Sequence, residues 1–352
     1  MRYALDLTIE EWKHYLSEKQ EKTFLAASIF RWIHGRRVMD FNAMSDLPLK
    51  LREKLKEDFY LALPAVAAEQ VSPDGTRKYL LSLGNASLPD RSVTDVECVL
   101  MKYRFGYSLC ISSQAGCRMG CRFCASTLNG LERNLTGGEM AAQIYAVEQA
   151  AQVTVSHVVV MGCGEPFDNW DELMRYLSVI HSEEGKNLSY RNITVSTCGL
   201  PEKIRSFADT DLPVTLAISL HAPNDLIRRK IMRIAGAVDM DTLMDACRYY
   251  ISRTNRRITF EYLLIDHLND SKKEAEELAE RLKGLLCHVN VIPVNPVEEC
   301  GFSRPSEARI ADFVNTLENR HVPVTRRREM GGSIDAACGQ LRHKQSQQRT
   351  ER

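Results

Sequence analysis

Apolar side chains recur at helical spacing over the first sixty residues. They form three groups, within Trp12–Leu16, Leu25–Ile33 and Leu47–Leu55, and each group repeats at short helical intervals. Thr8 precedes the first group and Glu11 follows it three positions on, which is the spacing of a capping box. The pattern predicts a small N-terminal domain of short helices over residues 1–60.

The pattern changes to that of strands and turns over residues 61–106. The segment Ser72–Gly75 has the composition of a tight turn. The segments Arg77–Leu83 and Asp95–Leu100 then combine β-branched or aromatic residues with alternating polarity. We therefore expect β-hairpins that connect the N-terminal helices to the main domain.

From about residue 107, short apolar runs rich in β-branched residues alternate with amphipathic segments. The expected strands are Ser108–Ser113, His157–Met161, Ile193–Thr197, Val214–Leu220, Ile258–Ile265 and Val289–Val294. The expected helices are Glu139–Gln149, Asp171–His181, Glu202–Ala208, Asp241–Arg253, Lys272–Leu286 and Glu307–Asn319. Thr136 and Glu139 again have capping-box spacing, which predicts where the first of these helices begins.

Six βα units in series predict an α/β domain with a parallel sheet covered by helices. Their number and length favour a partial or closed barrel over residues 107–341, with a two-halved Rossmann domain as the alternative. The polar tail, residues 342–352, has the composition of a disordered segment.

Composition and charge narrow the function classes. The chain has 352 residues, with 46 basic and 46 acidic side chains, so its formal net charge is zero. This balance argues against a uniformly basic nucleic-acid binder, although local basic patches can still bind RNA. Eleven cysteines, no apolar signal core and no membrane-length apolar run favour a reducing, cytoplasmic compartment without membrane association.

Polar residues of unusual type follow the carboxyl ends of five predicted strands. They lie in the segments Cys117–Cys124, Gly162–Pro166, Ser196–Gly199, Ser219–His221 and Asn295–Pro296. Active sites of α/β barrels form at this rim of the sheet. The sequence therefore predicts that these five segments contribute to one site.

The sharpest signal is the set Cys117, Cys121 and Cys124, which has the spacing C-x3-C-x2-C. Three thiolates from one loop can hold three corners of a [4Fe–4S] cluster and leave the fourth iron open for a small molecule. Clusters of ferredoxins that only transfer electrons use four cysteines. Zinc is the alternative, and it would need a fourth ligand such as Cys110 or His157.

This cysteine spacing, directly after the first strand of a βα array, resembles the signature of the radical S-adenosylmethionine (SAM) superfamily. The segment Gly162–Pro166 resembles the Gly-Glu-Pro segment of the same superfamily. The resemblance implies a partial (β/α)6 barrel that binds one [4Fe–4S] cluster and SAM. In that superfamily, one electron from the cluster cleaves SAM to a 5′-deoxyadenosyl radical.

Further motifs resemble the RlmN/Cfr family of RNA adenine methyltransferases. They are Ser333–Leu341, Ser108–Cys117, Ser219–Asp225 and Ile292–Pro296, together with Ile29–Ile33 and Leu51–Leu55 near the N-terminus. The match spans nearly the whole chain. RlmN-type members methylate C2 of adenine and Cfr-type members methylate C8, and the Gly-Glu-Pro sequence and the N-terminal helices favour the RlmN type.

The resemblance implies roles for individual residues. Cys338 takes a methyl group from one SAM, a second SAM yields the radical, and Cys110 resolves the protein–RNA crosslink through a disulfide with Cys338. Glu97 matches the proposed general base. The implied SAM contacts are Gly164, Glu165, Ser196, Ser219, Leu220, His221 and Asn295. Taken singly, a free cysteine or a strand-end histidine also fits a structural role in the core.

The resemblance also implies partners. They are 23S rRNA near the peptidyl transferase centre, tRNA at the adenosine that follows the anticodon, and an electron donor such as a flavodoxin. The target adenine must leave its stack to be reached, and we expect the enzyme to be a monomer. The arginines expected to contact RNA phosphates are Arg118, Arg122, Arg133 and Arg326–Arg328.

Two segments depart from the family pattern. Cys163 stands where Met or a small residue is expected, and Ile231–Gly236 lacks the expected Pro-Ile-Asn sequence. Three alternatives therefore remain: a Cfr-type C8 methyltransferase, a divergent radical SAM enzyme in which Cys338 is structural, and a zinc-stabilised RNA-binding module.

Overall fold

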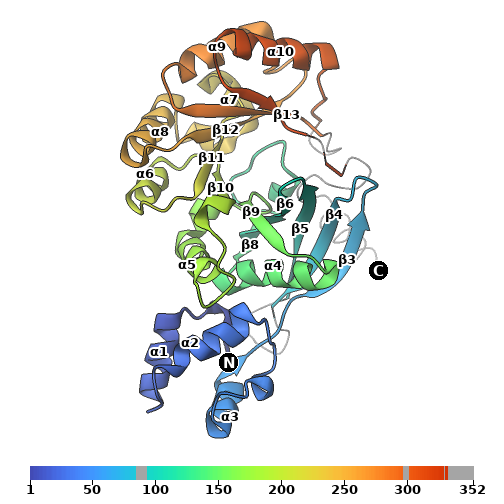
Figure 1. Ribbon diagram of the computed structural model, residues 1–352. Helices are drawn as coiled ribbons and strands as arrows, with labels where there is room; N and C mark the ends of the chain where they lie inside the picture. Colours follow the sequence, from blue (N-terminus) through green and yellow to red (C-terminus); the bar gives the residue numbers. More distant parts are fainter. Residues whose placement is uncertain (85–92, 296–300, 329, 332–352) are drawn as a thin grey trace.

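A mixed ten-stranded sheet forms the centre of the protein. The computed structural model describes residues 1–84, 93–295, 301–328 and 330–331. The strands lie in the order β14-β13-β12-β11-β10-β9-β6-β5-β4-β3, so the sheet has two ends and forms a partial rather than a closed barrel (Figure 1). A Rossmann arrangement would reverse direction from a central strand, whereas the strands from β9 to β14 follow one another in sequence order.

All six predicted strands are present and are parallel to one another. They are β6 (Gly106–Ile111), β9 (Val155–Val160), β10 (Ile193–Thr197), β11 (Thr215–Ser219), β12 (Ile258–Leu264) and β13 (Cys287–Pro293). A seventh parallel strand, β14 (Val324–Arg326), pairs with β13 and was not predicted. Its three residues are too few to produce a recognisable periodicity.

The six predicted helices are also present. They are α4 (Gly137–Ala151), α5 (Trp170–His181), α6 (Pro201–Asp209), α8 (Met240–Thr254), α9 (Lys272–Leu282) and α10 (Glu307–Asn319). The predicted capping box of Thr136 and Glu139 begins α4. Helix α9 ends at Leu282, earlier than predicted, because Lys283 leaves the helical conformation and Gly284 has a positive φ of 78°. The short helix α7 (Asp225–Ile231) was not predicted; the side chain of Asn224 caps it.

The N-terminal residues form the expected short helices. These are α1 (Ile9–Glu18), α2 (Leu25–Phe30) and α3 (Leu49–Asp58), and the capping box of Thr8 and Glu11 begins α1. Figure 1 shows them at one end of the molecule, beside α4 and α5. The carboxylate of Asp6 accepts a hydrogen bond from Gly138 N, and Arg175 donates to the Asp6 carbonyl. The domain boundary at residue 60 and the tail over residues 342–352, which lies outside the described residues, stay predictions.

The predicted hairpins join the main sheet instead of forming a separate linker. Strands β3 (Ala65–Val71), β4 (Arg77–Leu83) and β5 (Thr94–Tyr103) pair antiparallel in series, and β5 pairs antiparallel with β6. The predicted turn closes β3 and β4 with a hydrogen bond from Gly75 N to the Ser72 carbonyl. The sheet therefore extends beyond the barrel strands on the side of β6.

The two faces of the sheet have different surroundings. On β12, Ile258, Phe260, Tyr262 and Leu264 pack in the main hydrophobic core, whereas Glu261 on the opposite face lines a cavity. The same alternation holds along the other barrel strands, because successive side chains of a strand point to opposite faces. The core-facing side is the one that helices cover, and the other side is the inner face of the partial barrel. Among the described residues, no helix combines the length and apolarity that crossing a bilayer requires.

Candidate active site

A cavity of about 560 Å³ lies on the inner face of the sheet. Its volume falls within the range of about 300–1,000 Å³ that small-molecule sites occupy. The predicted site residues that line it are Cys110, Cys117, Cys121, Cys124, Gly164, Glu165, Ser196, Ser219, His221 and Asn295. They come from six segments that follow or belong to different strands, so the predicted convergence at one rim is found in the structure.

Three predicted site residues are not among those that line the cavity. Leu220 is buried in the main core, and its carbonyl accepts a hydrogen bond from Arg228. Glu97 lies on β5 and pairs with Lys78. Cys338 lies outside the described residues. The nine cysteines within the described residues are all free, and the predicted Cys110–Cys338 disulfide involves a residue outside them.

A small hairpin holds the loop that carries the three clustered cysteines. Strands β7 (Gln114–Gly116) and β8 (Leu131–Asn134) pair antiparallel on either side of this loop. Gly116 has a φ of 77°, and a Cβ atom there would lie 2.0 Å from the Gly130 carbonyl oxygen. Cys117 N donates to that same oxygen at 2.9 Å. Glycine at position 116 therefore allows the close approach that begins the loop.

The loop itself is fixed by backbone contacts. The Thr127 hydroxyl donates to the carbonyls of Cys121 and Cys124, and Arg122 N donates to the Ile231 carbonyl at 2.8 Å. The divergent segment that begins at Ile231 thus supports the loop directly. Burial raises the pKa of the Cys117 and Cys121 thiols to about 12, so binding of iron must displace their protons.

The arrangement of the three thiols fits a cluster. Within the described residues, no three His, Cys, Asp or Glu side chains converge as a single metal ion requires. In a cubane cluster each thiolate binds a different iron, so the three sulfurs need only face one space. His157, one of the two alternative zinc ligands, instead contacts Ser156 and packs against Phe105. The donor set of three cysteines on one cavity therefore supports a [4Fe–4S] cluster with one open iron.

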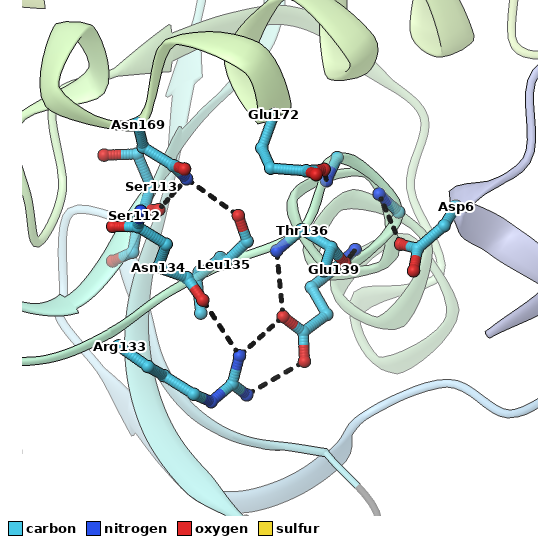
Figure 2. Close-up of polar contacts among 12 residues, drawn as sticks. Asp6, Ser112, Ser113, Arg133, Asn134, Leu135, Thr136, Glu139, Asn169 and Glu172 are labelled. Atoms are coloured by element: carbon cyan, nitrogen blue, oxygen red, sulfur yellow. Dashed lines mark hydrogen bonds and ion pairs between the residues drawn. The ribbon is translucent and has the colours of Figure 1, made fainter. Parts of the chain in front are cut away.

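The N-terminus of α4 anchors the return from this loop, as Figure 2 shows. Arg133 on β8 makes two hydrogen bonds to the Glu139 carboxylate, which also accepts from Thr136 N. The Asn169 amide donates to the carbonyls of Ser113 and Leu135. These contacts join the segment before the cysteine loop, the segment after it and the start of α5, so the cluster loop sits on a rigid base.

Glu165 is held in the cavity wall by backbone donors. Its Oε2 accepts from Cys198 N at 2.7 Å and its Oε1 accepts from Phe167 N at 3.0 Å. Burial raises the pKa of the Glu165 carboxyl, and these donors oppose that effect. Gly164 precedes it with a φ of 108°, and a Cβ there would meet Gln114 N at 2.7 Å. The carboxylate is therefore oriented before any ligand arrives, as binding of an ammonium group requires.

His221 is both a satisfied core residue and part of the cavity wall. Its Nδ1 accepts from Leu263 N at 3.0 Å, and its ring packs edge-on against Phe123 at 4.9 Å. Burial lowers the pKa of the imidazole to about 3, so the ring is neutral. Because Nδ1 is an acceptor, the proton of the neutral ring lies on Nε2.

Cys110 and Glu97 lie on the same face of neighbouring strands but in different surroundings. Cys110 lines the cavity and packs with Val99 and Met101 in a small apolar cluster. The Glu97 carboxylate forms a buried ion pair with Lys78 Nζ at 2.9 Å. This ion pair gives Glu97 a structural partner, and its role as a general base stays a prediction.

The predicted RNA-binding arginines fall into two groups. Arg118 makes a bidentate pair with Asp168, Arg133 pairs with Glu139, and Arg326 pairs with Glu307. Arg122 donates to the Lys230 carbonyl. Only two of the set, Arg327 and Arg328, line the cavity. The first group is therefore engaged within the protein, and the prediction of phosphate contacts rests best on the second.

Sequence reasoning missed three polar residues around the cavity. Glu261 lines it from the middle of β12, and a glutamate within an otherwise apolar strand was the available signal. Arg228 is fully buried and donates to the carbonyls of Cys198 and Leu220, which holds the ends of β10 and β11 together. The unexpected Cys163 has a local role, because its sulfur accepts a hydrogen bond from Gly116 N at 3.2 Å.

Comparisons with known proteins agree with this site. Residues 4–61 match the ribosomal RNA large subunit methyltransferase N-terminal domain, and residues 111–282 match the radical SAM superfamily. A crystal structure of a radical SAM methyltransferase from Sphaerobacter thermophilus has a TM-score of 0.89 and 42% sequence identity, over 97% of this chain and 99% of that chain. The predicted radical SAM fold is thereby confirmed.

Relatives with names match over the same extent. The chain is 47% identical over 343 residues to the probable dual-specificity RNA methyltransferase RlmN of Clostridium perfringens (strain SM101 / Type A), covering 97% of each chain. It is 46% identical over 341 residues to the protein of the same name from Clostridium tetani, covering 97% of this chain and 95% of the relative. With its cysteine loop and its cavity, the chain therefore belongs to the RlmN family of SAM-dependent RNA methyltransferases, within the radical SAM superfamily.

Proposed function

We propose that this enzyme methylates C2 of adenine in 23S rRNA near the peptidyl transferase centre, and in tRNA at the adenosine that follows the anticodon. The observation that carries the proposal is the single cavity that joins Cys110 to the three clustered cysteines and to Glu165, Ser219 and Asn295. The relatives' printed name, dual-specificity RNA methyltransferase, supports two classes of RNA substrate.

The choice of a radical route follows from the chemistry of the two carbons to be joined. C2 of adenine is electrophilic, and so is the sulfonium methyl group of SAM, so direct transfer lacks a nucleophile. When bound, one [4Fe–4S] cluster supplies the electron that cleaves SAM reductively. Cys117, Cys121 and Cys124 would hold the cluster, and Glu165 would orient the SAM ammonium group with its preformed carboxylate.

The remaining steps belong to cysteines. Cys338 would attack the methyl group of a first SAM as a thiolate, and a second SAM would be used to activate that methyl group. The Cys110 thiol would then release the product by forming a disulfide with Cys338. Gly331 lines the same cavity as Cys110, and the seven residues from Gly331 to Cys338 can span at most about 25 Å. Cys338 is therefore within reach of Cys110.

The proposal includes three further elements. Two SAM molecules are consumed per turnover, an external donor such as a flavodoxin supplies the electron, and the enzyme acts in the cytoplasm as a monomer. Arg327 and Arg328 at the cavity wall would contact phosphates beside the exposed adenine. A Cfr-type C8 methyltransferase remains the second candidate.

The test is to follow deuterium from SAM into RNA. Reconstituted enzyme, a reductant and SAM with a trideuterated methyl group are incubated anaerobically with 23S rRNA fragments or tRNA, and the digested nucleosides are analysed by mass spectrometry. We expect 2-methyladenosine that retains two deuteriums, because one hydrogen is lost from the methyl group. Product should disappear in Cys338→Ala and persist in Cys247→Ala, a control thiol buried in the core.

Other outcomes would redirect the assignment. Product at C8 would identify the Cfr-type reaction. Formation of 5′-deoxyadenosine without modification of either RNA would contradict the proposed substrates while leaving the radical chemistry intact.

A further inference from the structure

One carboxylate oxygen in the cavity wall has no protein partner. The Glu261 side chain is buried, and its Oε1 accepts a hydrogen bond from Asn290 Nδ2 at 3.3 Å. Its Oε2 has no hydrogen-bond partner within the described residues, although Glu261 lines the cavity. An unpaired buried polar atom costs about 1–3 kcal/mol, so its presence in a native fold calls for an explanation.

The position of Glu261 in the sheet indicates which part of a ligand it faces. Ser219 on β11 pairs with Glu261, and Glu261 pairs with Asn290 on β13. The Ser219 and Glu261 side chains both line the cavity. A hydroxyl and a carboxylate thus lie side by side on adjacent strands, below the rim where β11 and β12 end.

This pair lies toward one end of the cavity. The cysteine loop and Glu165, which would hold the amino-acid end of SAM, follow β6 and β9. Strands β11, β12 and β13 lie further along the sheet, beyond β10. A SAM molecule anchored at the cysteine loop would therefore direct its adenosine toward Glu261.

The donors of SAM are few enough to be assigned by elimination. The ammonium group belongs beside Glu165, and the flat adenine ring suits the apolar pair Leu263 and Ile292, one step nearer the rim on β12 and β13. The ribose carries two adjacent hydroxyl donors on one edge. Burial raises the pKa of the Glu261 carboxyl, with Arg327 opposing the effect, and in either protonation state the group retains an acceptor lone pair.

We propose that Glu261 is a SAM-binding residue whose Oε2 accepts a hydrogen bond from a ribose hydroxyl of the adenosine moiety. The inference rests on the use of SAM in the proposed function and is independent of which RNA is methylated. An internal RNA nucleotide has its 3′ oxygen esterified, so the two free hydroxyls of this ribose distinguish SAM from the RNA target.

The test combines two substitutions with a set of matched ligands. Glu261→Met removes both oxygens with little change of volume, and Glu261→Gln keeps a hydrogen-bonding amide. Binding of S-adenosyl-L-homocysteine and of its 2′-deoxy and 3′-deoxy analogues is measured anaerobically on the cluster-reconstituted full chain. S-adenosyl-L-homocysteine has no transferable methyl group, so Cys338 stays unmodified during the measurement.

We expect the wild-type enzyme to bind S-adenosyl-L-homocysteine about tenfold more tightly than at least one deoxy analogue, since one hydrogen bond to a carboxyl group is lost. In Glu261→Met this preference should fall to within about twofold, because the acceptor is absent. Glu261→Gln should retain part of the preference. Glu318→Met, at an exposed position on α10, is the matched control and should bind like wild type.

A stability measurement separates ligand binding from a structural role. Removing a buried, unpaired oxygen should leave the unfolding temperature of Glu261→Met unchanged or raised in the absence of ligand. The proposal is overturned if Glu261→Met discriminates between the ligands as wild type does, or if it unfolds well below wild type. Failure to methylate RNA with ligand discrimination intact would overturn the proposed function and leave this inference standing.

Discussion

Single residues in this cavity meet a structural need and a chemical one at the same time. The carboxylate of Glu165 is fixed by two backbone N–H groups, and the imidazole of His221 is fixed by one. Each side chain still lines the cavity. Preorganisation of this kind lowers the cost of binding, because the side chain does not have to be ordered when the ligand arrives.

Cys163 provides a residue-scale prediction. Its sulfur accepts the buried N–H of Gly116 at the start of the cysteine loop. Cys163→Ala leaves that donor unpaired and should lower the free energy of unfolding by about 1–3 kcal/mol. Cys163→Ser should cost less, because its hydroxyl can accept the bond. Denaturant unfolding of the protein without iron measures both variants.

The control for Cys163 is Cys247→Ala, which removes a similar volume from the main core. Its loss of stability reports packing alone. If Cys163→Ala and Cys163→Ser are equally destabilised, and no more than the control, the hydrogen bond to Gly116 contributes nothing measurable.

At the scale of elements, the β7–β8 hairpin determines whether the three cysteines can share one space. Its two strands approach so closely at Gly116 and Gly130 that a side chain at the first position would overlap the carbonyl of the second. Both glycines have a positive φ, of 77° and 69°. A Cβ at Gly130, in contrast, would meet nothing within 4 Å.

These two glycines make a matched pair of substitutions. Gly130→Ala should cost only the backbone strain of a left-handed residue, about 1–2 kcal/mol, and should keep its iron. Gly116→Ala must also break the bond from Cys117 N to the Gly130 carbonyl, so it should lose most of its iron on reconstitution. Iron and sulfide content per chain measures the difference. Equal iron content in the two variants would show that the close approach is unimportant.

On the scale of the whole molecule, buried polar contacts attach the N-terminal helices to the barrel. Glu148 on α4 contacts Arg37 from the N-terminal region and Lys186 from the segment after α5. His34 reaches the hydroxyl of Tyr145 on α4 at 3.1 Å and packs against Phe30. The N-terminal region and the barrel therefore share one continuous core.

His34 makes this attachment sensitive to pH. Burial lowers the pKa of His34 to about 3, against 6.5 for an exposed histidine. Between these values the unfolded chain binds more protons than the folded one, so stability is lost as pH falls below about 6.5. The slope is at most about 1.4 kcal/mol per pH unit for this group. His34→Gln should flatten the pH dependence of unfolding, measured in urea between about pH 7.5 and 5.5.

His14→Gln, at an exposed position on α1, is the control and should keep the wild-type dependence. An unchanged slope in His34→Gln would mean that His34 does not couple protonation to unfolding.

The sequence by itself determined the features that depend on neighbours along the chain. The capping boxes of Thr8 and Thr136, the bounds of β10 and α10 and the cysteine spacing were all readable, because periodicity and capping involve residues within a few positions of each other. The rim location of the site followed as well, since the carboxyl ends of parallel strands lie at one edge.

Only the tertiary structure decided which distant groups meet. It joined β3, β4 and β5 to the barrel sheet, paired Arg118 with Asp168, and left Oε2 of Glu261 without a protein partner. Pairing between distant strands depends on surfaces that form only when the chain is packed. The same arginine or glutamate spacing is compatible with an RNA contact, an internal ion pair or a ligand site, and only its packed surroundings separate these roles.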